Sequence, residues 1–214
     1  VSCGRNASII SALYSNPSCV KFCILYPGKY ALNSFNLIIT PLHDSNKFAP
    51  DQKILQTTLA LSYPFTKQAK SDANPEEGIG VLFGGSNRSY KLTPAVCRSI
   101  ANQLVLLQKR TNAKLYWTAS RRTPSFLKEI LERELASSEV CAAELKDIDE
   151  FFERCDWILV SADSVSMISQ SVAYGRRVSV FTLPSGPMPS HKFKKFIDNL
   201  NRQNAITICH YDQL

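Results

Sequence analysis

The 214-residue sequence has few of the residues from which metal sites and disulfide frameworks are built. Only three histidines are present, and the seven cysteines show no paired short spacings. Structural zinc sites and disulfide-rich domains have such spacings, so we expect no metal site and no set of disulfides. Reduced thiols indicate a cytoplasmic protein. No apolar run reaches the roughly 20 residues that a membrane-spanning helix needs.

Several motifs of known enzyme and binding classes are also absent. The pair Gly84-Gly85 is not followed by Gly-Lys-Ser/Thr, which excludes a phosphate-binding P-loop, and the three-glycine dinucleotide pattern is missing. The Gly-x-Ser-x-Gly elbow of hydrolases does not occur. Aromatic and basic residues do not interleave as they do in RNA-binding modules, so we expect no nucleic acid partner.

The charge is unevenly distributed along the chain. The formal net charge is +7, with acidic residues dominant over residues 123–156 and basic residues dominant over residues 174–202. Such a basic region suits a phosphate, a nucleotide, a protein partner or an anionic membrane surface, which leaves a peripheral membrane contact open. For Lys192, Lys194 and Lys195 alone, a solvated charged face is the simpler interpretation.

Short apolar runs alternate with helical patterns, which is typical of an α/β fold with parallel sheets. A polar, proline-containing stretch at residues 66–77 is the best candidate for a linker. We expect residues 1–65 and 78–214 to form two domains, the first starting in the middle of a sheet. Strands are predicted near residues 1–5, 20–26, 35–40, 53–61, 78–83, 113–118, 140–145, 157–160, 178–181 and 205–209, and helices from about residues 7, 94, 124, 148, 165 and 191.

Helix starts are indicated by capping residues. The Thr-Pro pairs at residues 93–94 and 123–124 have the pattern of an N-cap followed by proline at the first helical position. Asn6 is expected to cap the first helix, with apolar residues at 9, 10 and 13 on one side. Asp163 or Ser164 is expected to cap the helix after strand 157–160, and a glycine at 175 suits its left-handed end.

A polar loop follows a predicted strand in three places, at residues 84–88, 120–123 and 161–166. Parallel strands end along one edge of a sheet, so these loops are expected to converge where such sheets bind ligands. Glycines let a backbone approach a phosphate, arginines bind it with two hydrogen bonds, and a helix N-terminus adds N–H groups. Alternatively, each loop is only a turn with helix caps. The candidate binding residues are Gly84, Gly85, Arg88, Ser120, Arg121, Ser164 and Ser166.

His43 and Asp44 follow the strand at residues 35–40. A histidine beside a carboxylate at a strand end can act as a general base or orient a sugar hydroxyl, which makes His43 the candidate catalytic residue. The alternative is a loop histidine next to an aspartate that belongs to a turn.

Five short motifs occur along nearly the whole chain in the order seen in a known family. They are Ser2-Cys3-Gly4-Arg5, Pro41-Leu42-His43-Asp44, Gly84-Gly85-Ser86-Asn87-Arg88, Ser120-Arg121-Arg122-Thr123-Pro124 and Asp163-Ser164-Val165-Ser166-Met167-Ile168-Ser169. In these motifs the sequence resembles the mitochondrial-fission (elongated-mitochondria) family, most of whose members are bacterial.

The resemblance implies two Rossmann-like domains of the B-type glycosyltransferase (GT-B) kind, with the N-terminal domain truncated. It also implies a nucleotide-sugar in the cleft between the domains, held by the C-terminal one, and no further cofactor. Gln170 stands where such enzymes usually have a ribose-binding glutamate, and a neutral amide is a weaker acceptor. The segment at residues 175–178 departs from the family's Gly-Lys-Pro-Val, and its Asn-Pro-Tyr segment is absent near residues 146–151.

Two functional hypotheses follow from the resemblance. In the first, the protein transfers a sugar without a metal, and Arg88, Arg121 and the helix starting near Ser164 stabilise the leaving diphosphate. In the second, it is a catalytically inactive adaptor at a membrane surface, as relatives in plants are when they recruit a dynamin-type GTPase. Loss of nucleotide binding on replacing Arg121 with alanine is expected under the first hypothesis.

Overall fold

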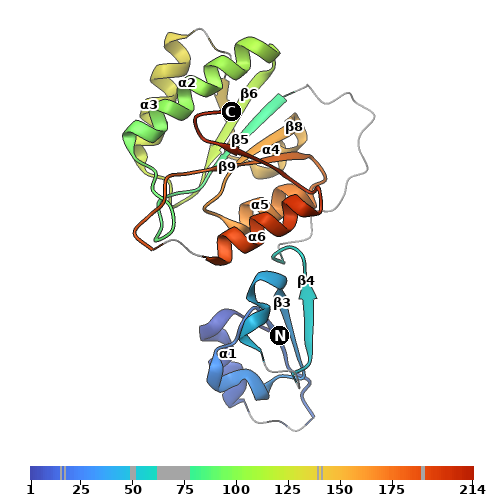
Figure 1. Ribbon diagram of the computed structural model, residues 1–214. Helices are drawn as coiled ribbons and strands as arrows, with labels where there is room; N and C mark the ends of the chain where they lie inside the picture. The colour runs from blue at the N-terminus through green and yellow to red at the C-terminus, as the bar shows by residue number, and fades with distance from the viewer. Residues whose placement is uncertain are drawn as a thin grey trace. The chain divides into compact units, whose positions relative to one another are not determined.

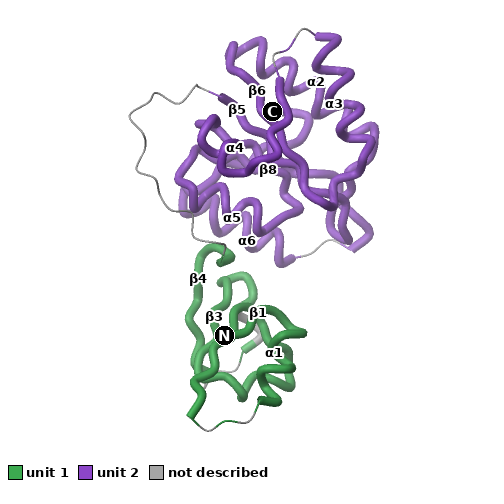
Figure 2. The backbone as a smooth tube through the Cα atoms, turned by 180° about the vertical axis from the view of Figure 1, so that it is seen from behind, with its two compact units in different colours: residues 1–62 green, residues 63–214 purple. Residues whose placement is uncertain are grey.

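The computed structural model describes residues 1–14, 16, 18–48, 52–61, 78–138, 140, 142–188 and 191–214. The chain forms two compact units, Val1–Ser62 and Tyr63–Leu214 (Figure 2). The predicted linker at residues 66–77 lies outside the described residues. Each unit has its own parallel sheet, so the predicted α/β class is confirmed.

The first unit contains a four-stranded sheet in the order β1-β2-β3-β4 (Figure 1). All three neighbouring pairs are parallel. The two central strands bury Cys23 and Ile38, and short helices connect the strands. The elements are β1 Ser2–Cys3, α1 Gly4–Leu13, β2 Phe22–Ile24, the 3-10 helix η1 Lys29–Ser34, β3 Leu37–Pro41, the 3-10 helix η2 Leu42–Lys47 and β4 Ile54–Thr57.

The prediction that Asn6 caps the first helix was wrong. Helix α1 begins at Gly4, directly after β1, and Cys3 is the N-cap residue without a side-chain hydrogen bond. Because strand and helix join without a loop, Asn6 falls within the first helical turn.

The inner side of α1 also differs from the prediction. Ser8 is fully buried, donates to the Gly4 carbonyl and lies with its Oγ 3.2 Å from the Cys23 sulfur. The residues expected to pack inward are exposed instead, Ile10 by 74% and Leu13 by 79%. A small polar residue brings this helix close to the sheet, and helical periodicity cannot reveal that choice.

The second unit contains a six-stranded parallel sheet in the order β10-β9-β8-β5-β6-β7. Its elements are β5 Gly78–Phe83, α2 Pro94–Thr111, β6 Lys114–Ala119, α3 Ser125–Ser137, β7 Ala142–Glu144, α4 Ile148–Arg154, β8 Cys155–Ser161, α5 Val165–Ala173, β9 Arg177–Thr182, α6 His191–Arg202 and β10 Thr207–His210. Each of them was predicted within a few residues.

Helices cover both faces of this sheet (Figure 1). On one face, alternate residues of β5 such as Val81 and Phe83 pack in one cluster with Leu104 of α2 and Leu131 of α3. On the other face, a Cβ on Gly80 would lie 2.5 Å from the Phe151 ring of α4. Strands buried on both faces read as apolar runs without alternation, which is why β5 and β8 were recognisable in the sequence.

The strand order places a topological switch point between β5 and β8. From β5 the chain proceeds outward through β6 and β7, and then returns to β8 and proceeds the other way through β9 and β10. Neighbouring strands whose connections leave in opposite directions open a crevice at their carboxyl ends, where open α/β sheets bind ligands.

The two Thr-Pro pairs behave differently. Thr93 caps α2, accepting a hydrogen bond from the Val96 N–H, with proline at the start of the helix as predicted. The corresponding prediction for Thr123 was wrong, because α3 begins at Ser125 after Pro124 and has no side-chain cap. The Thr123 hydroxyl donates instead to the Phe83 carbonyl, at 3.0 Å, and to that of Gly84, joining the end of β5 to the loop after β6.

The basic region at residues 174–202 is divided between the two ends of strand β9. Arg176 and Arg177 lie at the amino end of β9, where Arg176 pairs with Asp156. Lys192 lies at the start of α6, which follows the carboxyl end of the same strand. The sequence cluster is therefore not one continuous patch. Within the described ranges, no helix is long and apolar enough to cross a membrane.

Candidate functional site

The three polar strand-end loops converge, as predicted, and Asp163 joins them. Its carboxylate accepts hydrogen bonds from the Ser161 hydroxyl at 2.6 Å and from the Gly85 N–H at 2.8 Å. Arg122, in the loop after β6, forms an ion pair with the same carboxylate at 3.4 Å. The Asn87 side-chain amide donates to the Asp163 carbonyl at 3.1 Å. The ends of β5, β6 and β8 are thereby fixed to one another at the switch point.

Gly84 and Gly85 do not offer their N–H groups to a ligand. The Gly84 N–H donates to the Ser161 hydroxyl at 2.8 Å, and the Gly85 N–H is used by Asp163. A Cβ on Gly84 would lie 2.1 Å from the Asp163 carboxylate, and one on Gly85 would lie 2.1 Å from the Arg122 carbonyl. The predicted phosphate contacts of these two glycines are therefore wrong. The glycines are needed because the three loops pack against one another.

Asp163 is a buried acid, only 2% exposed. Burial raises the pKa of its carboxyl group above the ordinary value, although hydrogen bonds from Ser161 and Gly85 and the charge of Arg122 act in the opposite direction. The Arg122 side chain is 48% exposed, so this ion pair reaches from the interior to the surface. Its charge offsets that of Asp163 at the base of the loops.

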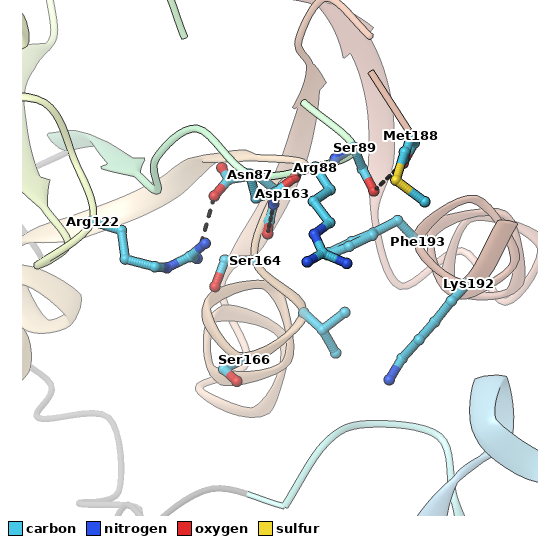
Figure 3. Close-up of a pocket in the computed structure, with 11 residues that line it drawn as sticks. Asn87, Arg88, Ser89, Arg122, Asp163, Ser164, Ser166, Met188, Lys192 and Phe193 are labelled. Atoms are coloured by element: carbon cyan, nitrogen blue, oxygen red, sulfur yellow. Dashed lines mark hydrogen bonds and ion pairs between the residues drawn. The ribbon is translucent and has the colours of Figure 1, made fainter. Parts of the chain in front are cut away.

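A pocket of about 730 Å³ lies above these loops in the second unit (Figure 3). It is formed by the loops after β5, β6 and β8, the first turn of α5, and the segment that leads into α6. The lining residues are Asn87, Arg88, Ser89, Arg122, Asp163, Ser164, Val165, Ser166, Met188, Lys192 and Phe193.

The backbone that carries Arg88 is held on both sides. The Met188 N–H donates to the Arg88 carbonyl at 2.8 Å, and the Gly186 N–H donates to the Ser89 carbonyl at 2.8 Å. The Asn87 side chain accepts the N–H groups of Ser89 and Tyr90. In the described part of the chain, no carboxylate pairs with the Arg88 guanidinium, which extends into the pocket (Figure 3). A fixed backbone thus presents an available cation.

Helix α5 directs its N-terminus at the same space. The Ser164 hydroxyl caps the helix by accepting the Met167 N–H at 3.4 Å. Helix geometry leaves the N–H groups of Val165 and Ser166 without an intrahelical acceptor, and both residues line the pocket. The opposite wall comes from α6, where Phe193 packs edge-on against Tyr90 with ring centroids 5.6 Å apart.

Of the predicted binding residues, the structure brings Arg88, Ser164 and Ser166 into the pocket. Ser120 has a structural role, bonding to the Thr123 hydroxyl and the Arg122 N–H. Arg121 is exposed outside the pocket lining, and its neighbour Arg122 takes the expected place. The predicted binding role of Arg121 stays a prediction.

The remaining predicted residues lie elsewhere. Gln170 is more than a turn into α5 and is not among the lining residues. His43 belongs to the first unit, where it lies in η2. Its side chain is buried, at 7% exposed, next to Asp44 at 4%. Its catalytic role stays a prediction. Among the described residues, no group of three metal-binding side chains comes together.

Sequence reasoning missed Asn87, Arg122, Lys192 and Phe193 as pocket residues. Asn87 and Arg122 lie inside the loops that were singled out, so a broader reading of each loop would have included them. Lys192 belongs to the basic region that suited a phosphate or a nucleotide, but only the return of α6 along the sheet places it and Phe193 opposite α5.

The sheet order, the position of the pocket and the paired units define an α/β protein with the fold of B-type glycosyltransferases. The chain belongs to the family described as mitochondrial fission ELM1, whose sequence model matches residues 1–213. The predicted family is thereby confirmed.

Similar proteins cover the chain to different extents. An uncharacterized protein of Rickettsia prowazekii is 25% identical over 134 residues, which are 60% of this chain and 37% of the relative. The crystal structure of Acinetobacter baumannii MurG is similar with a TM-score of 0.55 at 13% identity, covering 97% of this chain and 57% of that one. The crystal structure of Medicago truncatula UGT71G1 complexed with UDP-glucose is similar with a TM-score of 0.47 at 16% identity. The similarity covers 86% of this chain and 42% of that one. The chain thus spans less than two thirds of each of these proteins, and the MurG likeness shows the fold alone.

Proposed function

We propose that the pocket of the second unit binds the diphosphate of a nucleotide-activated sugar. The observation that carries this proposal is the Arg88 guanidinium, which faces the pocket beside the N-terminus of α5 at the switch point of the sheet. Arginine binds phosphate oxygens with two parallel hydrogen bonds, and a helix N-terminus adds N–H donors and about half a positive charge.

The same groups suit sugar transfer without a metal. When the bond between the sugar and the diphosphate breaks, negative charge grows on the departing phosphate oxygen. Arg88 and the Val165 and Ser166 N–H groups would stabilise this charge from fixed positions, which lowers the barrier because little reorganisation is needed. Arg122 supports the arrangement by offsetting the charge of Asp163, which would otherwise repel the diphosphate.

The proposal is tested with a panel of nucleoside diphosphates and their sugars in a thermal-shift assay. A ligand at 100 times its dissociation constant stabilises the folded state by about 2.7 kcal/mol, which is readily measured. We expect one nucleotide to raise the melting temperature, and Arg88→Ala to weaken its binding at least about tenfold.

Arg121→Ala is the matched control, because it removes the same charge from an exposed position outside the pocket. Equal losses of affinity in both variants would mean that general charge, rather than this pocket, binds the nucleotide. No shift with any nucleotide on folded protein would contradict the proposal.

An adaptor function is the second candidate, and a different observation favours it. Helix α1 exposes apolar residues on neighbouring turns, with Ile10 74% and Leu13 79% exposed, and Tyr30 of η1 is 99% exposed. Large exposed apolar groups of this kind mark interaction surfaces. Under this function the nucleotide panel gives no shift, whereas replacing Ile10 and Leu13 with glutamate abolishes partner binding without loss of fold.

A further inference from the structure

Arg88 lies within a turn that the side chain of Asn87 closes. The Asn87 amide oxygen accepts hydrogen bonds from the Ser89 N–H at 2.7 Å and from the Tyr90 N–H at 3.0 Å. The Asn87 N–H donates in turn to the Tyr90 carbonyl at 3.0 Å. Asparagine side chains fix turns in this way, because their oxygen replaces a backbone acceptor. The backbone of Arg88 is therefore held by the residue that precedes it.

The same side chain joins this turn to the start of α5. Its amide nitrogen donates to the Asp163 carbonyl at 3.1 Å, and Asp163 directly precedes Ser164, the N-cap residue of α5 (Figure 3). Among the described residues, this is the only hydrogen bond between residues 87–90 and residues 163–166. One side chain thus connects the two groups that the pocket offers to phosphates.

The other contacts of the turn lead away from α5. The Arg88 and Ser89 carbonyls accept the N–H groups of Met188 and Gly186, both at 2.8 Å. The Ser89 hydroxyl donates to the Met188 carbonyl at 3.3 Å. These bonds attach the turn to the segment that leads into α6. They hold the loop in place, but they do not set the distance between Arg88 and the N-terminus of α5.

We infer that Asn87 is a positioning residue that makes the pocket select a diphosphate over a monophosphate. Under the proposed function, on which this inference rests, Arg88 binds one phosphate and the N-terminus of α5 binds the other. Two phosphates that share a bridging oxygen have a nearly fixed separation, so both are bound fully only where the two groups are held at a matching distance. Groups fixed in advance bind more tightly, because less freedom is lost on binding. A single phosphate needs only one of the two groups and gains little from Asn87.

The test compares a nucleoside diphosphate with the monophosphate of the same base, using the full 214-residue chain. Isothermal titration calorimetry would measure UDP against UMP or, if the nucleotide panel selects guanine, GDP against GMP. We expect the wild type to prefer the diphosphate by at least about tenfold. Asn87→Ala and Arg88→Ala should each reduce this preference to about twofold, because in both variants the second phosphate loses its positioned partner.

A double-mutant cycle shows whether Asn87 acts through Arg88. Arg88→Ala should weaken diphosphate binding about tenfold in the wild type, but at most about twofold in the Asn87→Ala background. The reason is that an arginine that is no longer positioned contributes little. A residue needed only for folding would leave the effect of Arg88→Ala unchanged. Equal losses in the two backgrounds therefore overturn the inference.

Asn87→Ser separates the turn from its link to α5. Serine offers the turn a hydroxyl acceptor but lacks the amide that reaches Asp163. In urea unfolding this variant should be more stable than Asn87→Ala, whereas its diphosphate preference should stay low. If serine restores the full preference, the turn alone positions Arg88, and the role assigned to the link with α5 is wrong.

Ser86→Ala is the matched control within the same loop. The Ser86 hydroxyl bonds to the Leu92 N–H and carbonyl, and Ser86 lies outside the pocket lining. This variant should keep the full preference for the diphosphate. A loss as large as that of Asn87→Ala would mean that any disturbance of the loop has the same effect, which overturns the assignment to Asn87.

The outcomes separate this inference from the proposed function. Diphosphate binding without a preference over the monophosphate, or a preference that both Asn87 variants retain, overturns the inference and leaves the proposed diphosphate site in place. If no nucleoside diphosphate binds the folded wild type, both are overturned.

Discussion

The backbone of Gly84 lies against the carboxylate of Asp163 so closely that a Cβ at Gly84 would be 2.1 Å from Oδ2. The two residues are 79 positions apart in sequence, and the Ser161 hydroxyl links them by accepting the Gly84 N–H and donating to Asp163. This contact joins the two strands at the switch point and forms the base beneath the pocket. The stability of the base and the shape of the pocket therefore depend on the same residues.

Replacing Gly84 with alanine should destabilise the second unit by about 3 kcal/mol or more. The added methyl group would force a buried carboxylate out of its hydrogen bonds, and both overpacking and lost hydrogen bonds lower the free energy of unfolding. Urea unfolding measures the effect. Gly175→Ala is the control, because nothing lies within 4 Å of its Cβ position and only its φ of +77° opposes alanine, at about 1–2 kcal/mol. Equal losses in the two variants would contradict the packing argument.

The buried Asp163 should make stability depend on pH. Its pKa is raised in the folded protein, so between about pH 3.9, the ordinary value, and the raised value the folded state binds more protons than the unfolded state. The free energy of unfolding should therefore fall as pH rises through this window. Asp163→Asn removes the titrating group, and the stability difference between wild type and variant should change over the window. A difference that is constant from pH 3 to pH 7 would contradict the raised pKa.

Ser164→Ala should lower the free energy of unfolding by about 1 kcal/mol, because it removes the N-cap of α5. Ser164→Thr keeps a capping hydroxyl and should recover most of the loss. Chemical denaturation of the three proteins gives the comparison. If the alanine variant is as stable as the wild type, or if the threonine variant is no more stable than the alanine variant, the Ser164 hydroxyl does not stabilise α5 as a cap.

The cysteines should differ sharply in reactivity. Burial raises the pKa of Cys97 and Cys155 to about 12 each, so neither thiol forms an appreciable thiolate at pH 8, and both side chains are fully buried. Iodoacetamide should label the exposed Cys3 and Cys19 first, with peptide mass spectrometry as the readout. Labelling of Cys97 in native buffer as fast as in urea would contradict the buried environment.

Local patterns predicted the elements but not every cap. The pairs at residues 93–94 and 123–124 are alike in sequence, yet only Thr93 caps a helix. Thr123 lies where the ends of β5 and β6 meet, and the carbonyls of Phe83 and Gly84 compete for its hydroxyl. A tertiary hydrogen bond decides between two roles that the sequence presents as identical.

The sequence also could not decide which single side chains belong to the site. The sequence indicated that an arginine of the loop after β6 belongs to the site and favoured Arg121. The structure selects Arg122, because the buried Asp163 carboxylate is the acceptor that this loop faces. Lys192 could not be chosen from its neighbours, since Lys192, Lys194 and Lys195 all lie in one basic run and Lys194 pairs with Asp198.

The sequence by itself determined the α/β class, the order of the elements and the convergence of the strand-end loops on one edge. These follow from hydrophobic runs, helical spacing and the rule that parallel strands end on the same side, all of which act over short distances in the chain. Tertiary structure decided what Gly84, Gly85 and Asp163 do there. Their contacts join residues almost 80 positions apart. Only the packing of β5 against β8 determines which polar groups form hydrogen bonds within the fold and which remain for a ligand.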